Sequence, residues 1–262
     1  MAVCTISLTL DSPINKGGRL HLCTAGEDVP LGCTLAQSEV PQLRVGNRLE
    51  NGEVCLVVVS VEWMPGTAET ASSPMYLLEA LTDIARGEAQ FSVARRGYSL
   101  AWITLSDKGA AGKRTDESGP LIGKLVGENL DLSYVQGFII PDEISQLKGL
   151  IAGLALTQCF DLILTTGGTG VGPRDITPEA TLAVVEKRLP GFERAMTSAS
   201  LVKTPHGAIS RAVAGTLGES IVVNMPGSPK AVAECLEPLL PTLKHTLEKL
   251  QGDPSDCAIL RR

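Results

Sequence analysis

Aromatic residues are scarce in this chain: phenylalanine, tryptophan and tyrosine together make up 3% of its 262 residues. The core must therefore rest on leucine, valine, isoleucine and alanine, a set that suits strands covered by alanine- and leucine-rich helices. No segment has 18 apolar residues in succession, and no basic region near the first residue precedes a long apolar stretch. We therefore expect no membrane-spanning helix, no membrane partner and a cytoplasmic protein.

Paired cysteine motifs and an excess of basic residues are also absent. The seven cysteines are widely spaced and form no CxxC pair, which argues against a disulfide framework and against a structural zinc site. With 23 basic and 29 acidic residues, the formal net charge is −6, so we expect no nucleic-acid partner. Small anionic ligands remain compatible with this charge, because local backbone amides and a few cations hold them.

Residues before 97 are typical of a small β-rich unit. Short β-type runs at Val3–Leu10, Arg19–Cys23 and Glu53–Glu62 alternate with turn residues. The segment Pro74–Arg86 follows a serine and repeats apolar residues at helical spacing, which predicts one short helix. These residues match no pattern with a known activity, and a structural or interaction role is favoured over a second active site.

Strand and helix alternate after residue 97. The expected strands are Ser99–Leu105, Tyr134–Ile140, Asp161–Thr165 and Ser220–Asn224. The expected helices are Glu117–Asn129, Glu143–Thr157, Pro178–Arg188, Phe192–Leu201 and Pro229–Leu250, the last broken near Pro238 or Pro241. Such alternation implies right-handed crossovers. We therefore predict an α/β fold with a mostly parallel sheet flanked by helices on both faces, preceded by a small β-rich domain.

The domain boundaries follow from this change of pattern. We assign 1–96 to a β-rich accessory domain with a short helix, 97–251 to the α/β domain, and 252–262 to a tail. Trp63 and Trp102 lie at or near predicted strand ends and are expected in the core. Open α/β sheets bind ligands beyond the carboxyl ends of their strands, which directs attention to the loops there.

A glycine-rich loop follows the apolar strand at Asp161–Thr165. It contains Thr166, Gly167, Gly168, Thr169 and Gly170, and continues through Val171-Gly172-Pro173 to Arg174 and Asp175. Glycines let the backbone approach a ligand and aim its amides at an anion, with the threonine hydroxyls and the arginine as further donors. A tight strand-to-helix turn is the plainer alternative. The spacing fits neither GxxxxGK[ST] nor GxGxxG, so a P-loop and a dinucleotide fingerprint are excluded.

Two acids follow separate strands of the predicted sheet. Asp142 ends the run Phe138-Ile139-Ile140-Pro141, and Asp175 ends the glycine loop. Each acid alone fits a helix cap or a loop position. As a pair at one sheet edge they suit Mg²⁺, which prefers oxygen ligands and shares itself between one or two acids and substrate phosphates.

Two further loops complete this edge of the sheet. The segment Asn224-Met225-Pro226-Gly227-Ser228-Pro229-Lys230 joins a strand to the last helix and offers a second anion site at a helix N-terminus, although an ordinary capped helix start explains it too. The first strand ends at Ser106 and Asp107 and is followed by the polar stretch Lys113–Gly119. Convergence of four polar or glycine-rich loops favours a binding site.

Taken together, these segments resemble the molybdopterin adenylyltransferases, the Mog/MoaB-like family that includes the G domain of gephyrin. The resemblance covers about 155 residues and rests on Thr165–Gly170, the RDITPEAT run Arg174–Thr181, Ser210–Gly215 and the PGSPKA run Pro226–Ala231, in family order. It implies a molybdopterin-binding/adenylyltransferase domain at 97–251. It also implies that the terminal phosphate of molybdopterin attacks the α-phosphate of ATP, with Mg²⁺ as the metal.

The resemblance also implies roles for individual residues. Asp142 and Asp175 become the catalytic acids, with Asp175 binding the metal and Asp142 binding the metal or orienting substrate. Nucleotide or molybdopterin contacts are expected from Ser106, Asp107, Thr166, Gly167, Gly168, Thr169, Gly170, Arg174, Pro226, Gly227, Ser228 and Lys230. A homotrimer is the expected assembly, and a downstream molybdate insertase is the expected protein partner. A non-catalytic molybdopterin-binding or scaffold protein of the same fold, and an insertase itself, are the alternatives.

Overall fold

The computed structural model describes residues 5–23, 33–36, 40–66, 68 and 71–254. It divides into two compact units. The first comprises residues 1–99, 132–134 and 157–160, and the second comprises residues 100–131, 135–156 and 161–262. Most of the tail at 252–262 lies outside the described residues, as do Val3 and Cys4 of the first expected strand.

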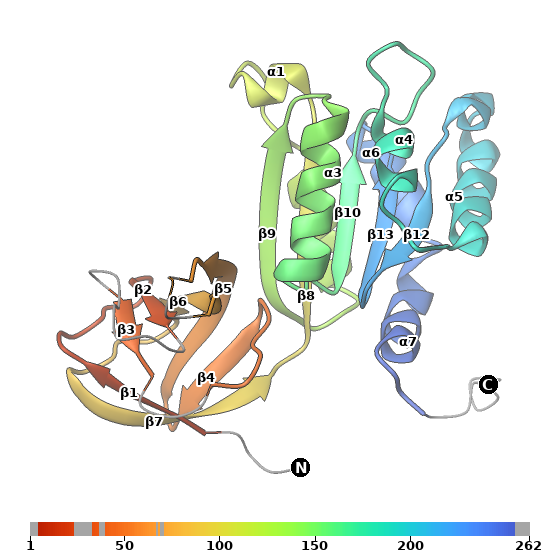
Figure 1. The fold of residues 1–262 in the computed structure, drawn as a ribbon. Helices are drawn as coiled ribbons and strands as arrows, with labels where there is room; N and C mark the ends of the chain where they lie inside the picture. Colours follow the sequence, from red (N-terminus) through yellow and green to blue (C-terminus); the bar gives the residue numbers. More distant parts are fainter. Residues whose placement is uncertain (1–4, 24–32, 37–39, 67, 69–70, 255–262) are drawn as a thin grey trace. The chain divides into compact units, whose positions relative to one another are not determined.

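The first unit is a seven-stranded sheet in the order β1-β7-β4-β5-β6-β2-β3 (Figure 1). Its strands are β1 (Thr5–Leu10), β2 (Arg19–Cys23), β3 (Cys33–Leu35), β4 (Asn47–Asn51), β5 (Val54–Met64), β6 (Ser73–Ala80) and β7 (Gly87–Arg95). Neighbouring strands of this sheet are antiparallel, except β2 and β3, which are parallel. An isolated bridge between Leu8 and Ala36 brings the two edges of the sheet together, so the sheet curls into a partial barrel.

The predicted helix at Pro74–Arg86 is wrong, because Ser73–Ala80 forms strand β6 and residues 81–86 are not helical. Its side chains alternate in burial: Tyr76, Leu78 and Ala80 are buried while their neighbours are partly exposed. This period of two is the strand pattern, and β6 pairs with both β5 and β2. The placement of Trp63 in the core is also wrong, since its side chain is 64% exposed.

The second unit contains a six-stranded sheet in the order β11-β12-β13-β10-β8-β9. Its strands are β8 (Tyr98–Leu105), β9 (Leu132–Ile140), β10 (Leu162–Thr166), β11 (Lys187–Arg188), β12 (Ala214–Leu217) and β13 (Ser220–Met225). Strands β8 and β13 pair parallel with β10, but β12 pairs antiparallel with β13 and with β11. The sheet is therefore mixed rather than mostly parallel, because a tight turn at Gly218 (φ +55°) reverses the chain between β12 and β13.

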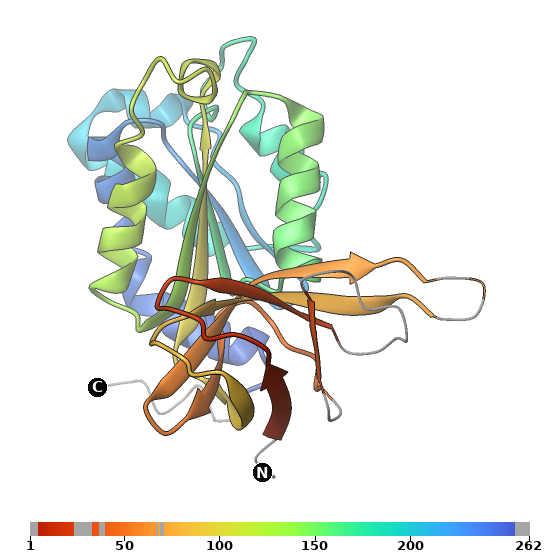
Figure 2. The same cartoon turned by 90° about the vertical axis from the view of Figure 1, so that its left-hand side faces the viewer.

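Helices cover both faces of this sheet, as expected. They are α1 (Asp107–Ala110), α2 (Ser118–Gly127), α3 (Ile144–Ala152), α4 (Thr177–Leu182), α5 (Pro190–Lys203), α6 (Pro229–Leu236) and α7 (Leu240–Leu250). Helix α2 packs with α6, and α3 packs with α4. Figure 2 shows α2 (yellow-green) and α3 (green) on opposite faces. The last predicted helix is broken around Pro238, as the sequence indicates, while α4 ends at Leu182 instead of reaching Arg188.

The centre of the sheet explains why these strands form. Every residue of β10 and β13 is buried, which is typical of central strands covered by helices on both faces. Trp102 on β8 is packed against Gly119 and Gly123 of α2 and Gly137 of β9, where an added Cβ atom would lie 2.2–2.8 Å from the indole. Among the described residues, none of the helices combines the length and the apolar character needed to cross a bilayer.

Candidate active site

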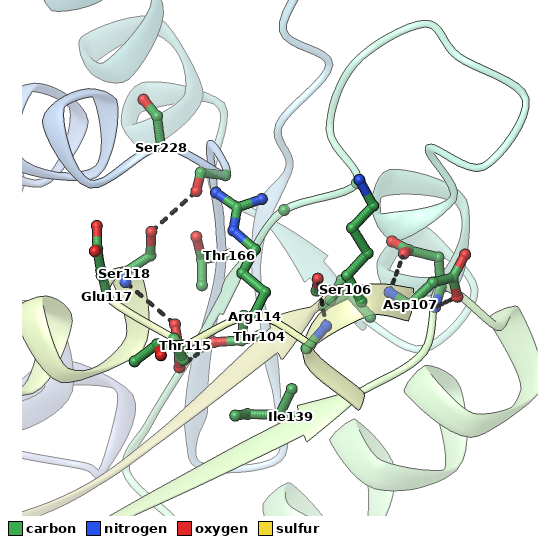
Figure 3. Close-up of a pocket in the computed structure, with 18 of the residues that line it drawn as sticks. Thr104, Ser106, Asp107, Arg114, Thr115, Glu117, Ser118, Ile139, Thr166 and Ser228 are labelled. Carbon is green, nitrogen blue, oxygen red and sulfur yellow. Dashed lines mark hydrogen bonds between the residues drawn. The ribbon is translucent and has the colours of Figure 1, made fainter. Parts of the chain in front are cut away.

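A cleft of about 430 Å³ lies at the carboxyl edge of the second unit's sheet. Four chain segments line it, and Ile139 and Asp142 at the end of β9 complete it; the segments are 104–109, 114–118, 166–168 with 174–175, and 227–229. Figure 1 shows α1 and the loop after β10 at this same end of the sheet. In Figure 3, Ser118, Thr166 and Ser228 lie toward one end of the cleft and Asp107 toward the other. Loops far apart in sequence thus form one concave site.

The glycine loop begins with two residues in the left-handed backbone region. Gly167 has φ +98° and Gly168 has φ +63°, and a Cβ atom on Gly167 would lie 2.6 Å from the carbonyl oxygen of Leu105. The hydroxyl of Thr177 donates to the carbonyl of Gly167 at 2.8 Å, and the amide of Thr177 donates to the carbonyl of Gly168 at 3.0 Å. The amide of Gly168 has no hydrogen-bond partner in the described part of the chain, so it is a donor for a ligand.

The loop before α6 supplies a second set of donors. The hydroxyl of Ser228 caps the helix by accepting a hydrogen bond from the amide of Ala231 at 3.2 Å. The amides of Gly227 and Ser228 donate to no group among the described residues. Since α6 is eight residues long and its N-terminus faces the cleft, these amides suit an anion.

Hydroxyl groups hold this second loop against its neighbours. Thr166 donates to the carbonyl of Pro226 at 2.7 Å, and Ser118 donates to the carbonyl of Gly227 at 2.9 Å. Both hydroxyl protons are used in these bonds, so each oxygen presents only acceptor capacity to the cleft. The two hydroxyls therefore fix the loop rather than donate to a phosphate.

Asp142 is bound to Asp107 by a reciprocal pair of hydrogen bonds. The amide of each residue donates to the carboxylate of the other, with both nitrogen–oxygen distances at 3.2 Å. The residue before α3 is Glu143, so Asp142 does not cap that helix. Burial raises the pKa of Asp142, and the nearby charges of Asp107 and Asp175 act in the same direction. A cation that binds beside this carboxylate would stabilise its ionised form.

Asp175 closes the glycine loop. Its carboxylate accepts a hydrogen bond from the amide of Gly172 at 2.7 Å, and a Cβ atom on Gly170 would lie 2.7 Å from the same oxygen. Asp142 approaches the other side of this loop, since its carboxylate would lie 3.3 Å from a Cβ atom on Gly168. Both predicted acids therefore line one cleft.

Arg174 reaches the cleft already paired with two acids. Its guanidinium donates two hydrogen bonds to Asp107, at 2.8 and 3.2 Å, and one to Glu143 at 2.9 Å. The arginine lowers the pKa of Asp107, and the two acids raise the pKa of Arg174. Its charge is therefore largely compensated within the protein.

The structure separates the predicted binding residues into two groups. Those that line the cleft are Ser106, Asp107, Thr166, Gly167, Gly168, Arg174, Gly227 and Ser228. Outside its lining are Thr169, Gly170, Pro226 and Lys230. Thr169 is buried, and the Lys230 side chain is 86% exposed and lies near Glu234.

The prediction of binding residues did not include the segment 114–118. Asp116 accepts a hydrogen bond from the Thr104 hydroxyl at 2.7 Å and from the amides of Ser118 and Gly119 at 3.1 and 3.0 Å, so it caps α2 beside the cleft. Arg114 lines the cleft and forms no ion pair with any described residue. Its position in the polar stretch Lys113–Gly119, after the first strand, was the feature of the sequence that could have indicated a binding residue.

A family model described as "probable molybdopterin binding domain" matches residues 101–245. This match spans more than half of the chain. The chain belongs to that family. The resemblance predicted from the sequence is thereby confirmed, and the family match does not extend into the residues before 101.

Individual relatives agree with this family. The molybdopterin adenylyltransferase of Helicobacter pylori is 39% identical over 154 residues, covering 58% of this chain and 86% of that protein. The molybdenum cofactor synthesis protein cinnamon of Drosophila melanogaster is 37% identical over 153 residues, also 58% of this chain, which spans only 26% of cinnamon. The crystal structure of the molybdopterin biosynthesis enzyme MoaB from Thermus thermophilus matches with a TM-score of 0.55 and 38% identity, covering 61% of this chain and 99% of that one.

Proposed function

We propose that this chain is a molybdopterin adenylyltransferase, which transfers AMP from ATP to the terminal phosphate of molybdopterin in molybdenum cofactor biosynthesis. The observation that carries the proposal is the meeting, in one cleft, of Asp142 and Asp175 with backbone amides that have no hydrogen-bond partner among the described residues. Family membership and the adenylyltransferase relative support the same reaction. The transfer depends mainly on positioning phosphates and stabilising their charge, and these groups provide both.

The donor set in the cleft fits Mg²⁺. Asp142 and Asp175 supply carboxylate oxygens. Burial raises the pKa of Asp142, the charges of Asp107 and Asp175 add to that rise, and a bound cation would offset both effects. Among the described residues, no group of three or more histidine, cysteine or acidic side chains is arranged to hold a metal ion. Two protein acids with substrate phosphates are the arrangement that magnesium commonly adopts. The ion would neutralise phosphate charge.

The remaining groups of the cleft divide the work of binding. The amides of Gly168, Gly227 and Ser228 bind phosphate oxygens without adding charge. The reciprocal bonds between Asp107 and Asp142 hold the second acid in place, with Arg174 bracing Asp107. In this proposal, residues outside the lining, such as Gly170, act through the shape of the loop.

The assembly and partners belong to the same proposal. We propose a homotrimer and transfer of the adenylylated product to a molybdate insertase. Relatives such as cinnamon are much longer than this chain, so a non-catalytic molybdopterin-binding or scaffold role is the second candidate. The presence of both acids and of the glycine loop in one cleft favours the enzyme.

Substitution Asp175→Asn tests the proposed reaction. An asparagine oxygen still accepts the hydrogen bond from Gly172, so the loop keeps its shape while the charge is lost. We expect pyrophosphate release from Mg-ATP in the presence of molybdopterin to fall by about 10²-fold or more, with molybdopterin affinity retained.

The exposed Asp131→Asn, which lies outside the cleft lining, is the matched control and should keep the wild-type rate. Wild-type activity in Asp175→Asn would contradict the role of this acid. A wild-type protein that binds molybdopterin but releases no pyrophosphate would instead support the scaffold.

A further inference from the structure

Arg211 contacts the glycine loop from outside the cleft. It precedes β12, and its backbone amide donates to the carbonyl of Thr169 at 2.9 Å. Its side chain donates from Nε to the carbonyl of Gly170 at 2.7 Å, and from Nη2 to the carbonyl of Asp175 at 2.8 Å. The third nitrogen, Nη1, forms an ion pair with Glu179 on α4. One residue thus joins the middle of the loop to its end.

The two halves of the loop are fixed by different residues. In the first half, Gly167 and Gly168, the amide of Gly167 donates to the carbonyl of Met225 at 3.2 Å, and Thr177 donates to the carbonyls of both glycines. This half is therefore held in place without a hydrogen bond from Arg211. In the second half, the carbonyls of Gly170 and Asp175 both accept from the one guanidinium group. Removing that group should therefore disturb the second half and spare the first.

Only an arginine fits this arrangement. The guanidinium holds its donors in a rigid planar fork, so bonds from Nε and Nη2 fix the separation of the two carbonyls that they reach. A lysine ammonium is a single point on a flexible stem and cannot impose that separation. Glu179 orients the fork from its outer side, and Arg211 in turn lowers the pKa of Glu179.

We propose that Arg211 is a positioning residue for Asp175: it fixes the backbone from which the metal-binding carboxylate projects. This inference rests on the proposed function for the role of Asp175. Arg211 is not among the residues that line the cleft, so we expect it to act through Asp175 and not by direct contact with substrate or metal. Misplacing a reacting group by about 1 Å can cost about 10²-fold in rate, which sets the size of the expected effect.

The test compares Arg211→Met and Arg211→Lys with the wild type. For Arg211→Met we expect kcat for pyrophosphate release to fall about 10²-fold and the Mg²⁺ concentration at half-maximal rate to rise about tenfold or more, while KM for ATP changes by less than about fivefold. Hydrogen exchange of the amides in peptides covering 169–175 should accelerate, and exchange in β10 should not. Arg211→Lys should recover only part of kcat.

Arg188→Met is the matched control, because Arg188 also forms a two-pronged pair with an acid, Glu193, but lies outside the cleft lining. It should keep wild-type kcat with a similar change in melting temperature. If Arg211→Met does not fold, the same measurements on Arg211→Lys decide the question.

Several outcomes would overturn the inference: kcat within about threefold of wild type, unchanged exchange at 169–175, or equal losses in kcat and ATP affinity. The last pattern would mark Arg211 as a general structural residue. An inactive wild type would refute the proposed function instead. The exchange measurement would then still decide whether Arg211 restrains the loop.

Discussion

Substitution Gly168→Ala measures how tightly the glycine loop is built. Gly168 has φ +63°, where a residue with a Cβ atom costs roughly 1–2 kcal/mol. The new Cβ atom would also lie 2.5 Å from the hydroxyl oxygen of Thr177, which must shift and weaken its hydrogen bond to Gly167, a loss of about 1 kcal/mol. The expected total is about 2–3 kcal/mol of unfolding free energy.

Gly112→Ala separates the two costs. Gly112 has a nearly identical φ of +68°, but no atom lies within 4 Å of its added Cβ, so only the backbone cost of roughly 1–2 kcal/mol applies. At about 2–4 °C per kcal/mol, Gly168→Ala should melt several degrees below Gly112→Ala. Adding Thr177→Ala removes the contact and should bring the further cost of Gly168→Ala down to that of Gly112→Ala.

The assay uses the chain's two tryptophans. In a Trp63→Phe background, fluorescence of Trp102 reports unfolding of the second unit alone, because Trp102 belongs to that unit. The same Cβ would lie 3.3 Å from a carboxylate oxygen of Asp142, so Gly168→Ala should also weaken Mg-ATP binding, measured by calorimetry. Equal melting temperatures for Gly168→Ala and Gly112→Ala would refute the reasoning about Thr177.

Two further predictions concern the charges of the cleft. Burial raises the pKa of Asp142 in the folded protein, so the contribution of this carboxyl to stability falls as pH rises from the ordinary pKa of 3.8 through the raised pKa. Without metal, Asp142→Asn should therefore have a higher melting temperature than wild type at pH 7 and should lose that difference below pH 3.8. A lower melting temperature of Asp142→Asn at pH 7 would contradict this. Removing Mg²⁺ with EDTA should weaken ATP binding by about tenfold or more in calorimetry, since each 1.4 kcal/mol of uncompensated repulsion is a factor of ten, and unchanged affinity would count against a metal between the acids and the phosphates.

Strand positions in the second unit could be predicted because their signals are local. The strands β8, β9, β10 and β13 were expected within two residues of their observed ends, since each is an apolar run bounded by polar or glycine residues. The antiparallel edge was missed because β12 is only four residues long, although Gly218 between two short apolar runs is a hairpin signal.

The error at β6 has a different origin. Leu77, Leu78, Leu81 and Ile84 fit a helical spacing, but Tyr76, Leu78 and Ala80 fit an alternating one equally well. Pairing with β5 and β2 on either side decides between the two patterns, and such partners are not visible in a local window.

Side-chain partners in the cleft were beyond the reach of sequence pattern. Strand ends indicated which loops meet there, because parallel strands place their carboxyl ends at one edge. Arg174 was expected as a positive charge for an anion, yet it is paired with Asp107 and Glu143, which lie 67 and 31 positions away. Arg211 lies 36 positions from Asp175, so its hydrogen bonds to the loop could be found only in the structure.

The charge of the cleft explains why these partners matter. Its lining carries five acids (Asp107, Asp116, Glu117, Asp142 and Asp175) against three cationic side chains (Lys108, Arg114 and Arg174). The charge of Arg174 is compensated by Asp107 and Glu143. The other donors that the cleft offers to an anion include backbone amides, which attract phosphate without neutralising the negative charge of the acids. Under the proposed function, a bare triphosphate entering this cleft would be repelled by the acids, whereas one carrying a divalent cation would be attracted by Asp142 and Asp175 and bound by the amides. In the proposed function, a preference for the metal-loaded nucleotide follows from combining neutral amide donors with an acidic pair, and the cationic side chains of Lys108 and Arg114 in the lining would reduce that preference.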